Sequence, residues 1–398
     1  MHNKCEVIVV NKIQRQAKSH NESMRKVKHI YSYPYKSFLS QSSGNLLING
    51  GLKDKRRDCV VQTIVDARSK GNESIIVFSE DGVLQEQLIA LAENGVIGQL
   101  YVCSEEYPIY DFFCGMRRNF VSEYFNRIAL ERGFRDTAEL NSYVDSFLSI
   151  LSTQVPVNLT SIRRFAKNDD ASISEISIEP FESDMIISSS RGGVAFRSLL
   201  NNTYNAFSTI TTPSCETSFS LNNLINKDCV VLINIPTYNS EFFSIYFAME
   251  LKSIINENFT CIFDDSITLN SDVMHSVIEV MKQRQKVTVI ISHENIISVS
   301  NTDEVIKNFN RNLILLNGNT PYVDLQKILS NFGQYTHMQP MANKSTPPRL
   351  LFTFYRGEGE ATVPYSRDRV ILQEEYGNEA LLKGGSGSEI VITKRLII

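Results

Sequence analysis

Two adjacent carboxylates, Asp264 and Asp265, follow a mostly apolar run in the stretch Phe259–Leu269 (FTCIFDDSITL). A buried parallel strand has this pattern when it delivers acidic side chains to the carboxyl edge of a sheet, where open α/β folds bind ligands. In nucleotide-hydrolysing proteins the first acid of such a pair holds Mg²⁺ and the second orients the attacking water. The alternative is a buried strand that is followed by an ordinary polar turn.

A second group of candidate binding residues is basic and lies near the N-terminus. It consists of Lys12, Arg15, Lys18, Arg25, Lys26 and Lys28. The aromatic sequence YSYPY follows at residues 31–35, and basic side chains beside tyrosines can contact phosphates and stack bases. A solvated loop explains the same composition. Because Pro34 and many Ser and Asn residues interrupt any apolar stripe, we expect a loop or an edge hairpin here rather than a helix.

The elements that must position the acid pair alternate between strands and helices in two parts of the chain. In the first part we expect strands at 5–10, 45–51, 74–79 and 98–103, with helices at 54–70 and 84–94. In the second part we expect strands at 228–235, before Asp264, at 287–292 and at 312–316, with helices at 241–256, 272–284 and 324–332. This alternation predicts a mainly parallel sheet.

Helical periodicity replaces this alternation in the middle of the chain, at 120–134, 138–155 and 191–207. The last residues indicate two strands around a Gly-Ser turn. We therefore expect three parts. Residues 1–110 form the first part of an α/β domain with its basic N-terminal segment, 111–225 a mainly helical insertion, and 226–398 the second part with a C-terminal hairpin.

Composition limits the class of protein. A chain of 398 residues with 42% hydrophobic residues and a net charge of −4 is ordinary for a soluble globular protein and has no global attraction to nucleic acid. No apolar run approaches the roughly 18 residues of a membrane helix, and the N-terminus does not read as a signal peptide. Seven cysteines without a CxxC pair and six scattered histidines indicate reduced thiols and no metal-binding spacing. We expect a cytoplasmic protein without an integral membrane segment.

The order of these elements resembles that of the additional-strand P-loop ATPases, and more closely that of the type IV secretion coupling proteins (TraD/TraG-like) of the FtsK/HerA superfamily. Residues 74–82 (SIIVFSEDG) stand where that family has a strand ending in a DPKG-like sequence. Asp264 and Asp265 stand at its acid pair, Arg284 at the end of the next helix, and His293 at a strand-terminal Gln. Residues 305–318 and 367–375 (RDRVILQEE) are similar to the segments that follow.

This resemblance covers about residues 44–398. It implies a RecA-like P-loop NTPase domain with a mainly parallel central sheet and a mainly helical insertion. It also implies ATP and Mg²⁺ as ligands, and a ring that is usually of six subunits.

The phosphate-binding loop departs from the family pattern. Such a loop needs two glycines, a Lys for the β/γ-phosphates and a Ser or Thr for Mg²⁺. When Gly50 is placed at the first glycine, Lys55, Arg56 and Arg57 take the places of the second glycine, the lysine and the hydroxyl. A register that starts at Asn49 also lacks the second glycine and the hydroxyl. The candidate nucleotide-binding residues are Asn49, Gly50, Gly51, Lys53, Lys55, Arg56 and Arg57.

The candidate catalytic residues are Asp264, Asp265, Arg284 and His293, with Asp264 as the candidate Mg²⁺ ligand. Asp265 stands where the family has Glu, and a misplacement of about 1 Å can cost roughly 100-fold in rate. His293 in place of Gln is a milder change because His also donates a hydrogen bond. Arg284 is a candidate finger or sensor, with a solvated helix end as the alternative. Glu80 and Asp81 lie in the segment that stands at the DPKG-like sequence of the family. The alternative for them is an ordinary polar loop at the end of a strand.

We therefore expect a degenerate coupling-protein-like ATPase domain that does not hydrolyse ATP and serves as an assembly or binding subunit of a DNA-transfer or secretion-type system. Its expected partners are copies of itself or a paralogous ATPase in a ring, DNA, and secretion or conjugation components. One alternative is an active, divergent ATP-driven DNA translocase in which Lys55 or Lys53 contacts the phosphates. Another is a nucleic-acid-binding module that uses the basic segment 12–28 and the cluster 53–57.

Overall fold

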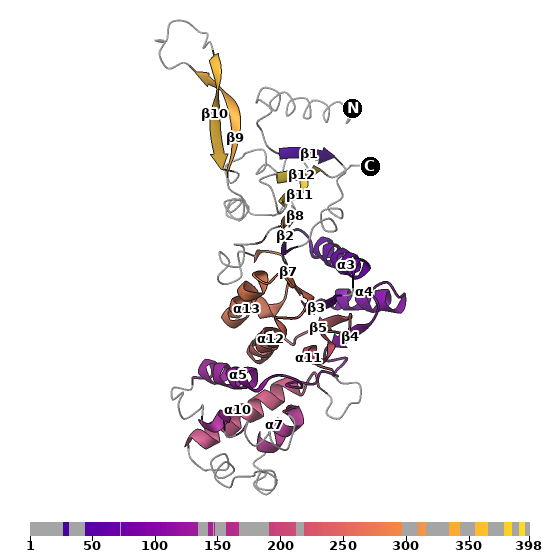
Figure 1. The fold of residues 1–398 in the computed structure, drawn as a ribbon, viewed down its shortest axis with the longest axis vertical. Helices are drawn as coiled ribbons and strands as arrows, with labels where there is room; N and C mark the ends of the chain where they lie inside the picture. Colours follow the sequence, from indigo (N-terminus) through magenta and orange to yellow (C-terminus); the bar gives the residue numbers. More distant parts are fainter. Residues whose placement is uncertain are drawn as a thin grey trace. The chain divides into compact units, whose positions relative to one another are not determined.

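The computed structural model describes residues 27–31, 44–71, 73–133, 142–145, 147, 157–166, 191–211, 219–296, 309, 311–315, 334–342, 355–364, 378–383 and 390–394. They belong to two compact units, one of Met1–Arg56 with Phe309–Ile398 and one of Arg57–Asn308 (Figure 1). The strand expected at 5–10, the helix expected at 324–332 and most of the one at 138–155 lie outside the described residues. The domain boundaries expected at 110 and 225 stay a prediction.

The unit Arg57–Asn308 is built on five parallel strands in the order β7-β6-β3-β5-β4. The strands are β3 (Ser74–Ser79), β4 (Leu100–Cys103), β5 (Val230–Ile233), β6 (Phe259–Asp264) and β7 (Val287–His293). Every residue of β3, β5 and β6 is buried, which explains their near-continuous apolar runs. The sequence therefore predicted these strands to within two residues at each end.

Helices cover both faces of this sheet, with α12 and α13 on one side and α4 on the other (Figure 1). They are α4 (Gly82–Glu93), α12 (Ser240–Ile254) and α13 (Asp272–Lys282), with the 3₁₀ turn η1 (Ile267–Asn270) before α13. Helix α3 (Lys53–Lys70) begins in the first unit and enters the second at Arg57. Most residues of α12 are apolar and buried, as in a central helix.

Between β4 and β5 the described residues form turns and isolated bridges at 104–117 and are mainly helical beyond them. The helices are α5 (Arg118–Glu131), α7 (Leu159–Ala166), α10 (Arg191–Phe207) and α11 (Leu221–Leu224). Helix α5 lies antiparallel to α12, because ion pairs join Lys252 to Glu123 at one end and Arg132 to Glu241 at the other. Stacked rings of Phe112 and Phe207, with centroids 4.1 Å apart, belong to a large aromatic core between the insertion and α12.

A fully buried carboxylate lies where the insertion leaves and rejoins the sheet. Glu250 of α12 accepts hydrogen bonds from the hydroxyl of Tyr110 at 2.5 Å, from the backbone N–H of Leu221 at 3.1 Å and from Nδ2 of Asn222 at 3.2 Å. Tyr110 precedes the insertion helices, whereas Leu221 and Asn222 follow most of them, so one side chain binds both ends of the insertion. Burial raises the pKa of Glu250 to about 7.

The unit Met1–Arg56 with Phe309–Ile398 contains a mixed sheet in the order β1-β12-β11-β8-β2. Its strands are β1 (Val27–Tyr31), β2 (Leu46–Gly50), β8 (Arg311–Leu315), β11 (Asn378–Lys383) and β12 (Ile390–Lys394), and β9 (Gln334–Ala342) and β10 (Tyr355–Pro364) form a separate antiparallel pair. β11 and β12 are antiparallel neighbours, as expected of a C-terminal hairpin. β1 pairs in parallel with β12, so among the described strands this part of the N-terminal segment is the outer strand of the sheet.

Two further features concern the described residues alone. No helix among them is both long and apolar enough to cross a bilayer. Their cysteines, Cys59, Cys103, Cys114, Cys229 and Cys261, are free thiols.

The buried Glu250 predicts a pH dependence of stability. Because its pKa is about 7 in the folded chain and near 4.5 when exposed, the folded state holds the extra proton between these values. The free energy of unfolding that protonated Glu250 contributes is therefore lost as pH rises from about 4.5 to 7. The loss amounts to up to about 3 kcal/mol. In urea unfolding at pH 5 and pH 8, Glu250→Gln should lose less stability over this interval than the wild type. Parallel pH profiles for the two proteins would contradict this assignment.

Candidate functional site

The predicted acid pair lies at the carboxyl edge of the five-stranded sheet. Asp264 is the last residue of β6 and is 3% exposed. Strand register places it level with Ser79 of β3 and Ser292 of β7, so these three side chains form one row on one face of the sheet. Oγ of Ser79 donates a hydrogen bond to Oδ2 of Asp264 at 3.1 Å. The edge thus presents a row of oxygen-bearing groups.

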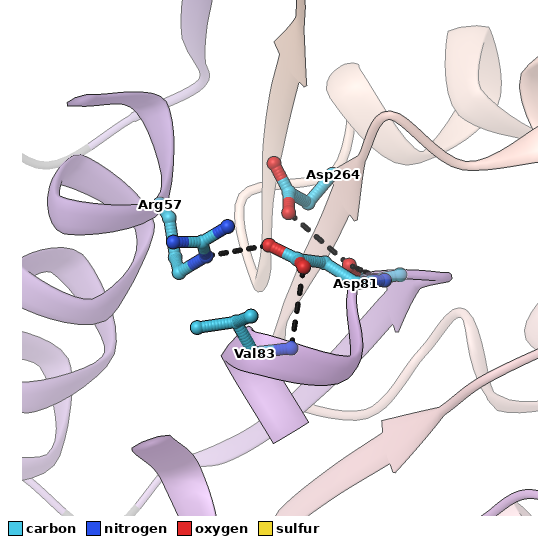
Figure 2. Close-up of polar contacts among 5 residues, drawn as sticks. Arg57, Asp81, Val83 and Asp264 are labelled. Atoms are coloured by element: carbon cyan, nitrogen blue, oxygen red, sulfur yellow. Dashed lines mark hydrogen bonds and ion pairs between the residues drawn. The ribbon is translucent and has the colours of Figure 1, made fainter. Parts of the chain in front are cut away.

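An ion pair joins helix α3 to this edge. Nε of Arg57 donates to Oδ2 of Asp81 at 2.5 Å, and the two side chains are 10% and 6% exposed. Asp81 is also the N-cap of α4, where its Oδ1 accepts the N–H of Val83 at 3.3 Å. The N–H of Asp81 donates to Oγ of Ser79 at 3.1 Å. A continuous polar path therefore leads from Arg57 through Asp81 and Ser79 to Asp264 (Figure 2).

The second acid of the pair holds the neighbouring loop. Asp265 has a left-handed backbone with φ of 46°, and its N–H donates to the carbonyl of Ser292 at 2.8 Å. Its Oδ1 accepts the N–H of Glu294 at 2.9 Å. Nδ1 of His293 accepts the N–H of Asn295 at 3.0 Å, which places the proton of the neutral ring on Nε2. Both predicted catalytic side chains thus take part in fixing the turn after β7.

Glu80 is a polar residue whose contacts sequence reasoning did not anticipate. Its Oε1 accepts the N–H of Ile267 at 3.0 Å and the hydroxyl of Ser266 at 3.2 Å, so it ties the end of β3 to the turn after β6. Burial raises the pKa of Glu80 to about 7. The only signal in the sequence was its position directly after an apolar strand.

Arg284 lies away from the acid pair. It is exposed in the turn between α13 and β7, and therefore at the amino edge of the parallel sheet, whereas Asp264 ends β6 at the carboxyl edge. The structure does not bring the two side chains together within one chain. A role of Arg284 as a finger would require a neighbouring protomer.

The glycine turn belongs to the other unit and has a different geometry from a phosphate loop. β2 ends at Gly50 and α3 already begins at Lys53, with the N–H groups of Lys55 and Arg56 donating to the carbonyl of Leu52 at 3.0 and 3.1 Å. Counting the eight motif positions from Gly50, the last five, residues 53–57, therefore lie inside the helix. Two residues remain between strand and helix to surround a phosphate.

Packing explains both glycines of this turn. Gly50 and Gly51 have φ of 85° and 71°, and a Cβ on either would lie 2.6 Å from an atom of Leu315 in β8. The guanidinium of Arg56 turns inward, where Nη1 donates to the carbonyls of Gly50 and Gly51 at 3.2 and 2.9 Å. The glycines thus allow β8 to approach closely, and the residue at the lysine position of the motif is buried in the turn.

The remaining predicted residues are placed only in part. Asn49 is buried in β2, whereas Lys53 and Lys55 are exposed on the first turn of α3. Lys28 lies in β1. The other basic residues of the N-terminal segment, Lys12, Arg15, Lys18, Arg25 and Lys26, lie outside the described residues.

Solved structures share this fold over most of the chain. The bacterial conjugative coupling protein TrwBdeltaN70, crystallised with sulphate, is 10% identical with a TM-score of 0.52, and the match covers 94% of each chain. VirB4 of Thermoanaerobacter pseudethanolicus is 11% identical with a TM-score of 0.52, covering 90% of this chain and 92% of that one. The plasmid coupling protein TrwB in complex with ADP and Mg²⁺ is 11% identical with a TM-score of 0.50, covering 94% of each chain.

No protein-family model matches the sequence, and no curated protein matches it significantly. Identities this low establish the fold alone. The chain has a coupling-protein-like P-loop ATPase fold of the α/β class, which confirms the architecture that the order of elements predicted.

Substitutions at Asp265 test whether this residue holds the loop. Asp265→Asn keeps the Oδ1 acceptor and tolerates a positive φ, so the free energy of unfolding should change by less than about 0.5 kcal/mol. Asp265→Ala loses the acceptor and retains the strained backbone, which should cost about 1–3 kcal/mol. Urea denaturation measures both values. Equal stabilities for the two variants would show that the side chain does not hold the loop.

Substitutions at glycine test the packing of the turn on β8. Gly51→Ala places a Cβ against Leu315 at positive φ and should destabilise the chain by at least about 2 kcal/mol. Gly82→Ala is the matched control, because a Cβ there meets no atom within 4 Å and lies in the first turn of α4. It should be neutral or slightly stabilising. If Gly51→Ala melts like the control, the turn is not packed as described.

Proposed function

We propose that this chain is a non-hydrolysing, coupling-protein-like ATPase-fold subunit that serves assembly or binding in a DNA-transfer or secretion-type system. The observation that carries the proposal is the early start of α3 at Lys53, with only two residues between it and the end of β2 at Gly50. A phosphate loop works by surrounding phosphates with backbone N–H groups between strand and helix, and in this chain those positions are helical. The loss is therefore one of backbone geometry as well as of side chains.

The acid pair supports the same proposal. Oδ2 of Asp264 accepts from Ser79, and Oδ1 of Asp265 accepts from the N–H of Glu294, so each carboxylate has a structural task. Arg57, at the position where Mg²⁺ needs a hydroxyl ligand, is a cation in an ion pair with Asp81. These residues do not fit a Mg²⁺–ATP complex, because a fixed guanidinium repels the metal and offers it no oxygen.

The proposed setting follows from the likeness to conjugative coupling proteins and VirB4. We propose a cytoplasmic subunit that assembles with copies of itself or with a paralogous ATPase in a ring, in contact with DNA or with secretion or conjugation components. In such a ring Arg284, at the amino edge of the sheet, would face a neighbouring protomer rather than its own acid pair.

An active, divergent ATPase is the second candidate, and the exposed positions of Lys53 and Lys55 on the first turn of α3 favour it. If the chain is an active ATPase, it binds ATP and Mg²⁺, one of these lysines contacts the phosphates, and Asp264 coordinates the Mg²⁺. A nucleic-acid-binding module without nucleotide is the third, and it rests on the basic segment 12–28.

Calorimetric titration separates the first two candidates. We expect ATP with Mg²⁺, at millimolar concentration, to give no saturable heat of binding with the wild type or with Asp264→Ala, because neither has a loop that can hold the phosphates. Phosphate release should equal the blank with and without DNA, also at protein concentrations where the chain self-associates. Saturable binding by the wild type that disappears in a folded Asp264→Ala protein would instead establish the active ATPase.

A further inference from the structure

We propose that the guanidinium of Arg57 is a built-in cation that takes the place of a divalent metal ion at the carboxyl edge of the sheet. The edge of this unit is then held in one arrangement without metal or nucleotide. The inference rests on the proposed loss of nucleotide chemistry and extends it, because it gives a positive role to the residue that replaces the hydroxyl. It concerns stability, so it is tested without nucleotide and can fail independently of the calorimetric result.

The ion pair between Arg57 and Asp81 places a permanent positive charge inside the protein. Arg57 and Asp81 are nearly inaccessible to solvent, and 2.5 Å separates Nε from Oδ2. Their pairing joins α3 to the junction of β3 and α4. An arginine suits this task because its charge is constant and its planar donors have a fixed geometry.

The polar path from Arg57 contains two buried acids, Asp81 and Asp264, with Ser79 between them. Buried carboxylates need compensation by hydrogen bonds and positive charge. In a metal-dependent site of this kind a bound ion supplies that charge only when the ion is present. Arg57 supplies it to Asp81 at all times, from the same chain.

The donor set does not fit a metal ion while Arg57 is in place. Oδ2 of Asp81 accepts from Arg57 and its Oδ1 from Val83, whereas Mg²⁺ requires near-octahedral oxygen coordination. Within the part of the chain that the structure describes, no three His, Cys, Asp or Glu side chains are arranged to hold a metal. The edge still carries oxygen atoms, and Oγ of Ser292, level with Asp264, is buried without a hydrogen-bond partner there.

The first experiment measures how the edge depends on Arg57. Arg57→Thr restores the hydroxyl of the motif but leaves the buried Asp81 carboxylate without this ion pair, so the melting temperature should fall by roughly 5–10 °C. Arg57→Thr with Asp81→Asn removes both charges and should recover at least about half of that loss. Arg57→Lys keeps a cation with poorer geometry and should lie between the wild type and Arg57→Thr. Lys252→Ala, which breaks a half-exposed pair, should shift the melting temperature by no more than about 2 °C.

The second experiment asks whether a metal ion can replace the guanidinium. Mg²⁺ at about 5 mM, compared with KCl at equal ionic strength, should raise the melting temperature of Arg57→Thr by about 2 °C or more. The wild type, Lys252→Ala and the Arg57→Thr/Asp81→Asn double variant should not respond.

Any one of three results would overturn the proposal. The first is a double variant that melts no higher than Arg57→Thr, and the second is an Arg57→Thr protein whose melting temperature does not change with Mg²⁺. The third is a wild type that Mg²⁺ stabilises as strongly as it stabilises the variant. If Arg57→Thr does not fold at all, recovery of a folded protein by the added Asp81→Asn substitution supports the proposal. Failure of that recovery contradicts it.

Discussion

The ion pair between Arg57 and Asp81 meets a constraint that governs much of the unit Arg57–Asn308: a carboxylate removed from water must find donors or a positive charge. The chain solves this differently at each buried acid. Asp81 pairs with an arginine, Asp264 accepts a serine hydroxyl, and Glu80 accepts a backbone N–H. Glu250 collects a tyrosine hydroxyl, a backbone N–H and an amide. Each solution joins elements that are distant in sequence, so these contacts specify how the helices and turns meet the sheet.

The pattern of apolar residues predicted most of the strands and helices of the fold. The boundaries of β3 and α10 were predicted as observed, and Asp264 was placed at the end of its strand, because buried strands and helices leave periodic signals within a few residues. The pairing of Arg57 with Asp81 was not predictable in the same way, since 24 residues separate them and Arg-Arg-Asp is an ordinary helical surface sequence. The role of Glu250 was hidden for a similar reason, because one acid in an apolar helix does not indicate its partners.

The glycine turn has part of the sequence of a phosphate loop but a different backbone geometry. Two consecutive glycines after a strand suggested a phosphate loop, and their positive φ values agree with the demand for glycine. The start of the helix was predicted to within one residue, because a helix was expected at 54–70 and α3 begins at Lys53. What the residues alone did not indicate was that the two glycines allow Leu315 of β8 to approach closely. The fold thus tolerates more changes of sequence than a phosphate-binding site does. Hydrophobic burial accepts many sequences, as the 10–11% identities to coupling proteins and VirB4 show, whereas a phosphate cradle accepts few.

The anchoring of the insertion at both of its ends has a consequence for the connection between β4 and β5. Ile109 pairs with Thr211, Tyr110 pairs with Phe219, and Glu250 binds both sides, so the two crossings between sheet and insertion are closed at their base. The chain therefore re-enters the sheet in the strand beside the one it left, and β5 pairs directly with β4. The insertion lengthens the path between these two strands along the chain without separating them in space.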